Sequence, residues 1–143
     1  MGSKRLSVLS LVAAVLGLLL AIGVMTAFAA CGPKEDGTWM HCHDVQIAIA
    51  VCAAAVAVVS ALATFIKAKG AKIALCLVAI VLCIVVLALP SVMPMCMVET
   101  MRCHAVMAPF ARIVAALADI LSIASLVQTV RADKKDLPKY GTL

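Results

Sequence analysis

The stretch that decides the fold is IALCLVAIVLCIVVLALPSVM, residues Ile73–Met93. It contains no charged side chain, and its length matches the roughly 20 apolar residues that carry an α-helix across a hydrocarbon core of about 30 Å. A helix that is apolar on every side has no polar face to present to water. The stretch therefore predicts a transmembrane helix.

Three further stretches have the same character, residues 6–30, 45–66 and 105–130. The chain of 143 residues is 66% hydrophobic and 13% charged, with a mean hydropathy of +1.19, and soluble globular domains lie far from these values. This composition excludes soluble enzymes and nucleic-acid-binding proteins. We predict one all-α membrane domain over residues 1–143, in which two tandem helical hairpins form a four-helix bundle in the lipid bilayer.

The basic residues predict how the bundle is oriented. Nine of the twelve Lys and Arg lie near the chain ends and in the short turn 67–72, whereas Lys34, Arg102 and Arg112 lie on the opposite side. Because segments rich in Lys and Arg stay in the cytoplasm, we predict cytoplasmic N and C termini in a cell membrane. Residues 132–143 then form a polar cytoplasmic tail.

The two loops on the exterior side, residues 31–44 and 94–104, repeat one motif rich in Cys, His and Met. In each loop a first cysteine is followed by a Met-x-Cys-His sequence at the start of the next helix. The first copy consists of Cys31, Met40, His41, Cys42 and His43, and the second of Cys96, Met101, Arg102, Cys103 and His104. Hairpins that both start in the cytoplasm are related by an axis along the membrane normal. The repeat therefore predicts that the two Cys-His corners meet at the outer surface.

This order of helices and motifs resembles a bacterial family of four-helix membrane proteins of unknown function. The resemblance covers nearly the whole chain, and the family's signature residues correspond to Cys31, Cys42, His43, Cys96, Cys103 and His104. Two positions depart from the pattern, because Asp44 stands where a Trp is common and Met97 where a Gly is common. The resemblance implies an auxiliary membrane subunit that is encoded beside FtsX-type ABC transporter genes, and we interpret the chain as a non-enzymatic accessory subunit. The implied partners are the transporter permease or a second copy of the chain.

Cys31, Cys42, Cys96 and Cys103 are predicted to lie outside the membrane, in a compartment where paired cysteines usually form disulfides. Four cysteines allow three connectivities. Pairing within each loop and pairing across the repeat are both geometrically reasonable, and each disulfide would add about 2 to 4 kcal/mol to a cap made of short loops. The alternative for the same residues is a quinone-coupled membrane thiol-disulfide oxidoreductase. The chain lacks the Cys-x-x-Cys spacing that such enzymes favour.

A third hypothesis is a copper or haem site at the outer end. His43 and His104 would form a symmetric pair, and His41, Met40 and Met101 add imidazole and thioether donors. Soft donors of this kind select copper(I), and an imidazole pair suits haem or zinc. Cysteines that are bonded to each other are lost as ligands, so the metal and disulfide hypotheses compete for the same residues.

Asp119 is the one acidic residue well inside a predicted span. Arg112 lies seven residues earlier on nearly the same helix face, so an ion pair between the two is the expected way to satisfy the carboxylate. Ser60 or Thr64 could bind it instead. The functional alternative for an intramembrane carboxylate is a path for ions or protons.

Small residues predict where the second span packs closely. Ala53, Ala57 and Ala61 recur at every fourth position, a pattern that lets a helix approach a neighbouring backbone in the membrane. The remaining cysteines lie inside the spans and are expected to be buried as small apolar residues: Cys52, Cys76 and Cys83.

Overall fold

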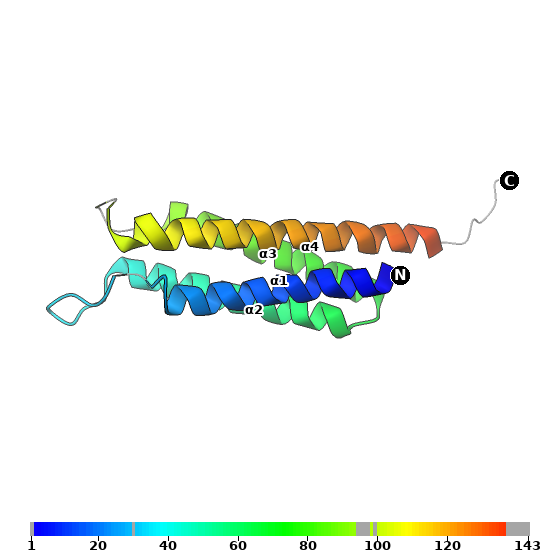
Figure 1. The fold of residues 1–143 in the computed structure, drawn as a ribbon, viewed down its shortest axis with the longest axis horizontal. Coiled ribbons are helices and arrows are strands. Elements are labelled where there is room, and N and C mark those ends of the chain that lie inside the picture. The colour runs from blue at the N-terminus through cyan, green and yellow to red at the C-terminus, as the bar shows by residue number, and fades with distance from the viewer. Residues whose placement is uncertain (1, 30, 94–97, 99, 137–143) are drawn as a thin grey trace.

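The structure is a computed structural model that describes residues 2–29, 31–93, 98 and 100–136. Within these residues every regular element is helical (Figure 1). The elements are α1 (Gly2–Met25), α2 (His41–Phe65), α3 (Lys69–Val92), a π-helix η1 (Cys103–Met107) and α4 (Ala108–Asp136). The predicted all-α fold with four long helices is confirmed.

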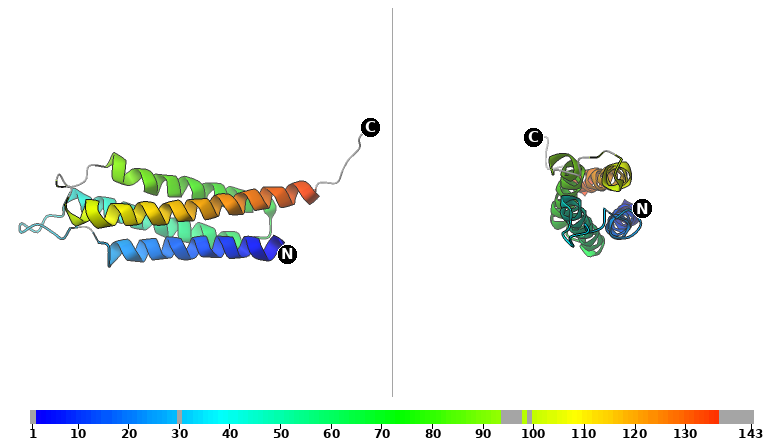
Figure 2. Two further views of the ribbon diagram at one scale, coloured as in Figure 1. Left: turned by 45° about the horizontal axis from the view of Figure 1, so that its top comes forward. Right: turned by 90° about the vertical axis from the view of Figure 1, so that its left-hand side faces the viewer.

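The four helices form an up-and-down bundle (Figures 1 and 2). α1 packs against α2 and α4, and α3 packs against the same two helices, so the contacts follow a closed ring. α1 begins and α4 ends at one end of the bundle, where the turn 66–68 also lies. This order is the one expected of two tandem helical hairpins.

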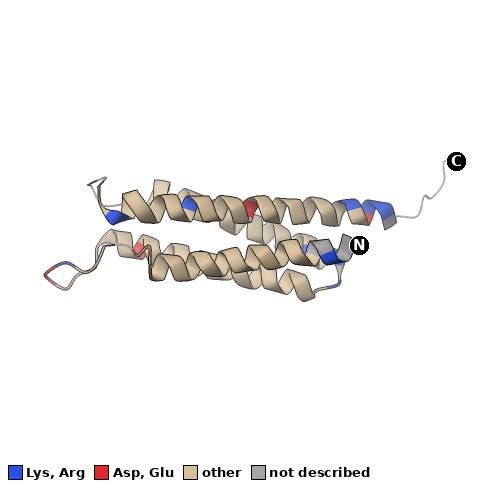
Figure 3. Cartoon of the chain, viewed as in Figure 1, with Lys and Arg blue, Asp and Glu red and all other residues tan. Residues whose placement is uncertain are grey.

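The two ends of the bundle differ in their chemistry (Figure 3). We call the end where α1 begins the basic end, because most described Lys and Arg gather there: Lys4, Lys67, Lys69, Lys72, Arg131, Lys134 and Lys135. The opposite end holds the Cys-His motifs, and we call it the cysteine end. Its loops carry only Lys34 and Arg102 as described basic residues.

Each long helix is long and apolar enough to cross a membrane. The candidate spans are Ser7–Met25, His41–Phe65, Lys69–Val92 and Cys103–Lys135. Their bounds differ from the predicted ones at both ends of the bundle, and at the basic end the third span begins four residues earlier and the fourth ends five residues later than predicted. α1 ends at Met25, where the Thr26 hydroxyl donates to the Ile22 carbonyl at 2.7 Å, and α2 begins already at His41.

The core changes character along the bundle. Toward the cysteine end it is apolar apart from the buried Gln46 and is built around Leu20, Val24, Ile49, Val86, Met107 and Ala111. Toward the basic end the buried side chains include hydroxyls from three helices: Ser10, Ser60, Ser122, Ser125 and Thr129. The predicted burial of Cys76 and Cys83 in α3 is confirmed, whereas Cys52 is only half-buried.

α1 and α2 approach each other closely at Gly17. A Cβ atom placed on Gly17 would lie 2.9 Å from the Ala57 nitrogen and 3.0 Å from the Ala53 oxygen. The predicted close approach of the alanine stripe is therefore confirmed at Ala53 and Ala57, and the neighbour is α1. A glycine facing alanines lets the two backbones meet with no side chain between them.

Candidate functional site

Two cysteines from different halves of the chain meet at the cysteine end. Cys31 follows α1 and Cys103 begins η1, and their Sγ atoms lie 3.3 Å apart. Cys103 is fully buried and Cys31 is half-buried. Both are free thiols. The contact joins the first cysteine of one motif to the Cys-His cysteine of the other.

The chain around Cys31 is held by contacts to both neighbouring helices. Gln46 of α2 donates its Nε2 hydrogen to the Val24 carbonyl at 2.9 Å, which satisfies a carbonyl in the last turn of α1. Arg102 Nη2 donates to the Ala27 carbonyl at 3.4 Å. These two bonds tie the end of α1 and the residues just after it to α2 and to the residue that precedes η1.

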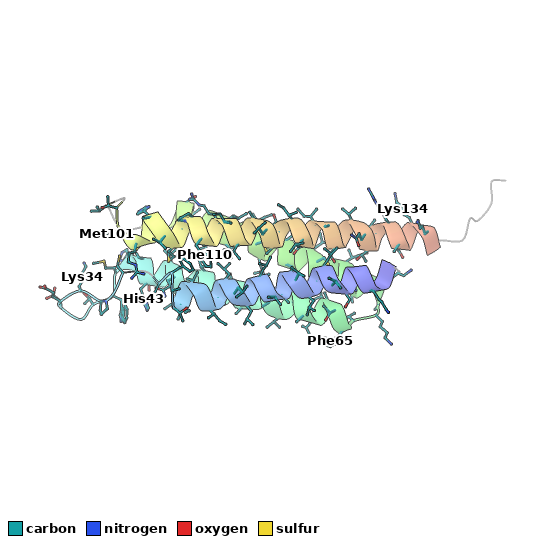
Figure 4. The ribbon with its side chains drawn as sticks, viewed as in Figure 1. Lys34, His43, Phe65, Met101, Phe110 and Lys134 are labelled. Carbon is teal, nitrogen blue, oxygen red and sulfur yellow. The ribbon has the colours of Figure 1, made fainter. Side chains whose placement is uncertain are left out.

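An aromatic stack closes the seam between α1 and α4. The rings of Phe28 and Phe110 lie with centroids 4.0 Å apart and planes at 15°. Gly23 leaves room for this stack, because a Cβ there would lie 2.9 Å from two atoms of the Phe110 ring. Phe110 is labelled in Figure 4. The sequence analysis did not predict this contact.

The π-helix η1 places Cys103 in the core. Its wide turn is closed by the Ala108 N–H donating to the Cys103 carbonyl, five residues earlier. The extra residue turns the start of this span so that Cys103 and Met107 are both fully buried. Single π-turns are frequent at functional sites.

The histidines of the two motifs have different surroundings. His43 is half-buried in the first turn of α2, and its ring stacks on Trp39 with centroids 3.9 Å apart and planes at 20°. His104 is half-buried in η1, and His41 is exposed. Met40 precedes α2, and Met101 lies just before η1 (Figure 4).

The predicted metal ligands form no three-residue cluster in the described part of the chain. Within those residues, no group of three or more His, Cys, Asp or Glu side chains is placed to hold a metal ion. Cys96, the fourth predicted exterior cysteine, lies outside the described residues. Cys42 is fully buried at the start of α2, and its sulfur is not a free thiol.

The expected ion pair between Arg112 and Asp119 is not formed. Arg112 is exposed and donates from Nη2 to the Ser91 hydroxyl of α3 at 3.0 Å. Asp119 Oδ1 is buried and has no hydrogen-bond partner among the described residues. Seven residues correspond to about 10 Å along a helix, and Arg112 uses its length to reach the end of α3 instead. Thr64, another expected partner, donates to the Ala61 carbonyl.

A small polar cavity lies between the helices toward the basic end, and the sequence analysis missed it. Its polar lining comes from all four helices: Ser10, Ser60, Cys76, Ser122 and Ser125. The hydroxyls of Ser10 and Ser125 lie 3.2 Å apart across it. The helical spacing of Ser122, Ser125 and Thr129 was the signal that could have revealed a hydroxyl-bearing face on α4.

These observations define the class of the protein as a multi-pass α-helical membrane protein, for which the bilayer is the solvent. The chain belongs to the family described as "Domain of unknown function (DUF4418)", which matches residues 13–128. No curated protein and no solved structure gives a significant match. The match runs from within α1 to within α4, so it includes both Cys-His motifs.

Proposed function

We propose that this protein is a non-enzymatic accessory subunit of a larger membrane assembly, with an exterior cap fixed by disulfides that cross the repeat. The supporting observation is the 3.3 Å separation between Cys31 Sγ and Cys103 Sγ. A disulfide bond is about 2 Å long, so a small movement of either side chain would close it. Closure releases two protons and passes two electrons to a disulfide-bearing oxidant of the exterior compartment.

The second disulfide in this proposal joins Cys42 to Cys96. The sequence repeat predicts a two-fold axis along the bundle that would exchange Cys31 with Cys96 and Cys42 with Cys103, because these residues hold equivalent places in the two motifs. The same rotation converts a pair of Cys31 with Cys103 into a pair of Cys96 with Cys42. That the sulfur of Cys42 is not a free thiol agrees with this pairing.

Cross-repeat disulfides would fix the two hairpins relative to each other at the cysteine end. Cys31 and Cys103 are separated by 72 residues, and closing a loop of that size restricts the unfolded chain by about 4 kcal/mol. The exposed loop 32–39 projects from this fixed base beyond the bundle (Figure 1). It carries Trp39, whose side chain is 56% exposed. A rigidly held loop of this kind suits contact with the exterior part of a partner.

The partner that the family resemblance implies is the permease of an FtsX-type ABC transporter, and a second copy of the chain is the alternative. The chain itself has few of the aromatic anchors that hold isolated bundles at the membrane surface, since its aromatic content is 3%. Association with a larger membrane protein would supply that positioning. Cross-linking in native membranes followed by affinity capture tests the partner, and recovery of neither a permease nor a second copy would reject the subunit proposal.

The cysteine pairing is tested by mass spectrometry of protein purified from membranes without reductant. We expect one proteolytic peptide pair that joins Cys31 to Cys103, and we expect it to separate on reduction. Cys31→Ser should remove this pair, whereas the matched change Cys52→Ser within α2 should leave it intact. A peptide that joins Cys31 to Cys42 would show pairing within the loop and contradict the proposal.

A thiol oxidoreductase is the second candidate, and the same sulfur contact favours it. Cys31 is partly exposed while Cys103 is buried, as in a pair whose outer cysteine attacks a client disulfide and whose inner cysteine resolves the intermediate. Incubation of the reduced protein with quinone separates the two functions. If the protein catalyses the oxidation of thiols with quinone as the electron acceptor, it is a thiol oxidoreductase and the structural proposal is wrong.

A further inference from the structure

Asp119 lies at mid-depth of the membrane domain without a partner for one of its oxygens. The candidate span that contains it runs from Cys103 to Lys135, and Asp119 stands halfway along. Its Oδ1 atom is buried and accepts no hydrogen bond. A carboxylate in such a place is costly when ionised and unpaired, so intramembrane acids usually carry a function.

Hydroxyl groups continue from Asp119 toward the basic end on the same helix. Ser122 lies one turn from Asp119, followed by Ser125 and Thr129, and all three are buried. The ten residues from Asp119 to Thr129 cover about 15 Å of helix. Ser122 and Ser125 line a small cavity together with Ser10 and Ser60, and apolar side chains form the rest of its wall. The cavity has at most the size of one water molecule, and the hydroxyls in its wall are the polar groups that such a water could bind.

The other direction from Asp119 is closed by apolar side chains. Toward the cysteine end α4 presents Ala115, Ala111 and Met107 to the core, and Ile49 and Val86 pack against them. An apolar region of this kind holds no stable water. The hydroxyl-bearing half of the bundle therefore offers polar partners to water near Asp119, and the half that leads to the cysteine end offers none among these core residues.

The groups that surround Asp119 leave it as the principal proton acceptor at this depth. Cys83 of α3 is the titratable group that faces it, close enough for their charges to interact. The neighbouring core residues of α1 and α2 at this level, Leu16 and Val56, are apolar. Ser122, the nearest hydroxyl on α4, donates to the Ala118 carbonyl at 2.8 Å.

We propose that Asp119 is a proton-binding site in the middle of the membrane, and that its proton exchanges with the basic end through the hydroxyl-lined cavity. A hydronium ion from that side transfers its proton to the carboxylate, which leaves one water molecule and one neutral carboxylic acid. Release reverses the step and needs no further reactant. A proton requires a single lone pair, whereas a metal ion would require several more oxygen ligands than this level provides.

Infrared spectroscopy of the full chain in vesicles tests this site, because a protonated carboxyl has a C=O band that the ionised form lacks. We expect a band at neutral pH that Asp119→Asn removes and Asp119→Glu restores at a shifted position. The matched change Asp44→Asn at the exposed start of α2 should leave it unchanged. Absence of the band in the wild-type protein at every pH would overturn the proposal.

The side of access is tested in vesicles whose orientation is known from trypsin cleavage at Lys134 and Lys135. We expect a change of pH at the basic end alone to alter the band, and a change at the cysteine end alone to leave it constant. The variant Ser10→Ala with Ser125→Ala should slow the response about tenfold, the factor that one lost buried hydrogen bond supplies. The control variant Ser91→Ala removes a hydroxyl near the cysteine end and should leave the rate of the response unchanged.

Three results would contradict this route. A band that follows the pH at the cysteine end would place the access on the wrong side. A band that responds to neither side would mean a carboxyl that is permanently protonated. An unchanged rate in the double serine variant would exclude the hydroxyl-lined cavity. None of these measurements depends on the state of the exterior cysteines, so they succeed or fail independently of the proposed cap.

Discussion

At the scale of single residues, Arg112 and Asp119 show how one helix face can meet two different environments. Arg112 is exposed and binds Ser91 near the cysteine end, where a long basic side chain can reach the membrane surface. Asp119 has a short side chain and lies two turns deeper, where the residue is half-buried and its Oδ1 atom is fully buried. A separation of seven residues is nearly two helical turns, so the two residues lie on a similar face of α4. Their side chains nevertheless do not pair.

The absence of this ion pair leads to a specific prediction. We expect Arg112→Ala and Asp119→Asn to act independently on stability, with a coupling below about 0.5 kcal/mol in a double-mutant cycle. The measurement is reversible unfolding in mixed detergent for both single variants and the double variant. A coupling above about 1 kcal/mol would show that the two side chains interact in the folded protein.

At the scale of helices, the contact of α1 with α2 depends on Gly17. We expect Gly17→Ala to lower the free energy of unfolding by about 1 to 3 kcal/mol, because the new methyl group meets the backbone of α2 at 2.9 Å and neither helix can yield locally. Gly70 provides the matched control, since nothing lies within 4 Å of a Cβ at that position. Gly70→Ala should raise stability by about 0.5 kcal/mol through the restricted unfolded chain. Equal effects of the two changes would argue against close packing at Gly17.

The helices themselves could be predicted from the sequence because the free energy of transfer into a bilayer is a sum over about twenty residues, so single polar residues do not change its sign. The contacts at the cysteine end could not. The extra residue in η1 rotates Cys103 into the core, and no composition signal marks a π-turn. The stack of Trp39 on His43 and the contact of Cys31 with Cys103 depend on loop geometry over a few ångströms. The repeat predicted that the two motifs lie at one end of the bundle, but it did not predict which of their residues contact each other.

At the scale of the whole molecule, the seam between α1 and α4 closes the ring of helices. It is joined at the cysteine end by the stack of Phe28 on Phe110 and by the contact of Cys31 with Cys103. Near the basic end the hydroxyls of Ser10 and Ser125 meet across the same seam. Because α1 and α4 are neighbours in the ring that no loop connects directly, this seam is the place where a covalent link adds most to the assembly of the two halves.

The proposed disulfide therefore has a measurable effect on the whole bundle. We expect Cys31→Ser and Cys103→Ser each to lower the thermal stability of the oxidised protein, and the double variant to be no less stable than either single one. Addition of reductant should lower the wild-type protein at least to that level, because it also opens the proposed bond between Cys42 and Cys96, while oxidised Cys52→Ser should behave as oxidised wild type. If the losses of thermal stability in the two single variants add up in the double variant, or if reductant does not change the stability of the wild-type protein, the two sulfurs are not bonded.

The orientation of the bundle decides whether that disulfide can form, and it follows from the unequal charge of the two ends. Seven described Lys and Arg lie at the basic end, whereas the loops of the cysteine end carry Lys34 and Arg102. Retention of basic segments predicts that the basic end is cytoplasmic. A reporter that is active only in the cytoplasm should therefore work when fused after Leu143, and a reporter that requires export should work when inserted in loop 32–39. The reverse pattern would place Cys31 and Cys103 in a reducing compartment, where a thiol pair, and not a disulfide, would be the resting state of the cap.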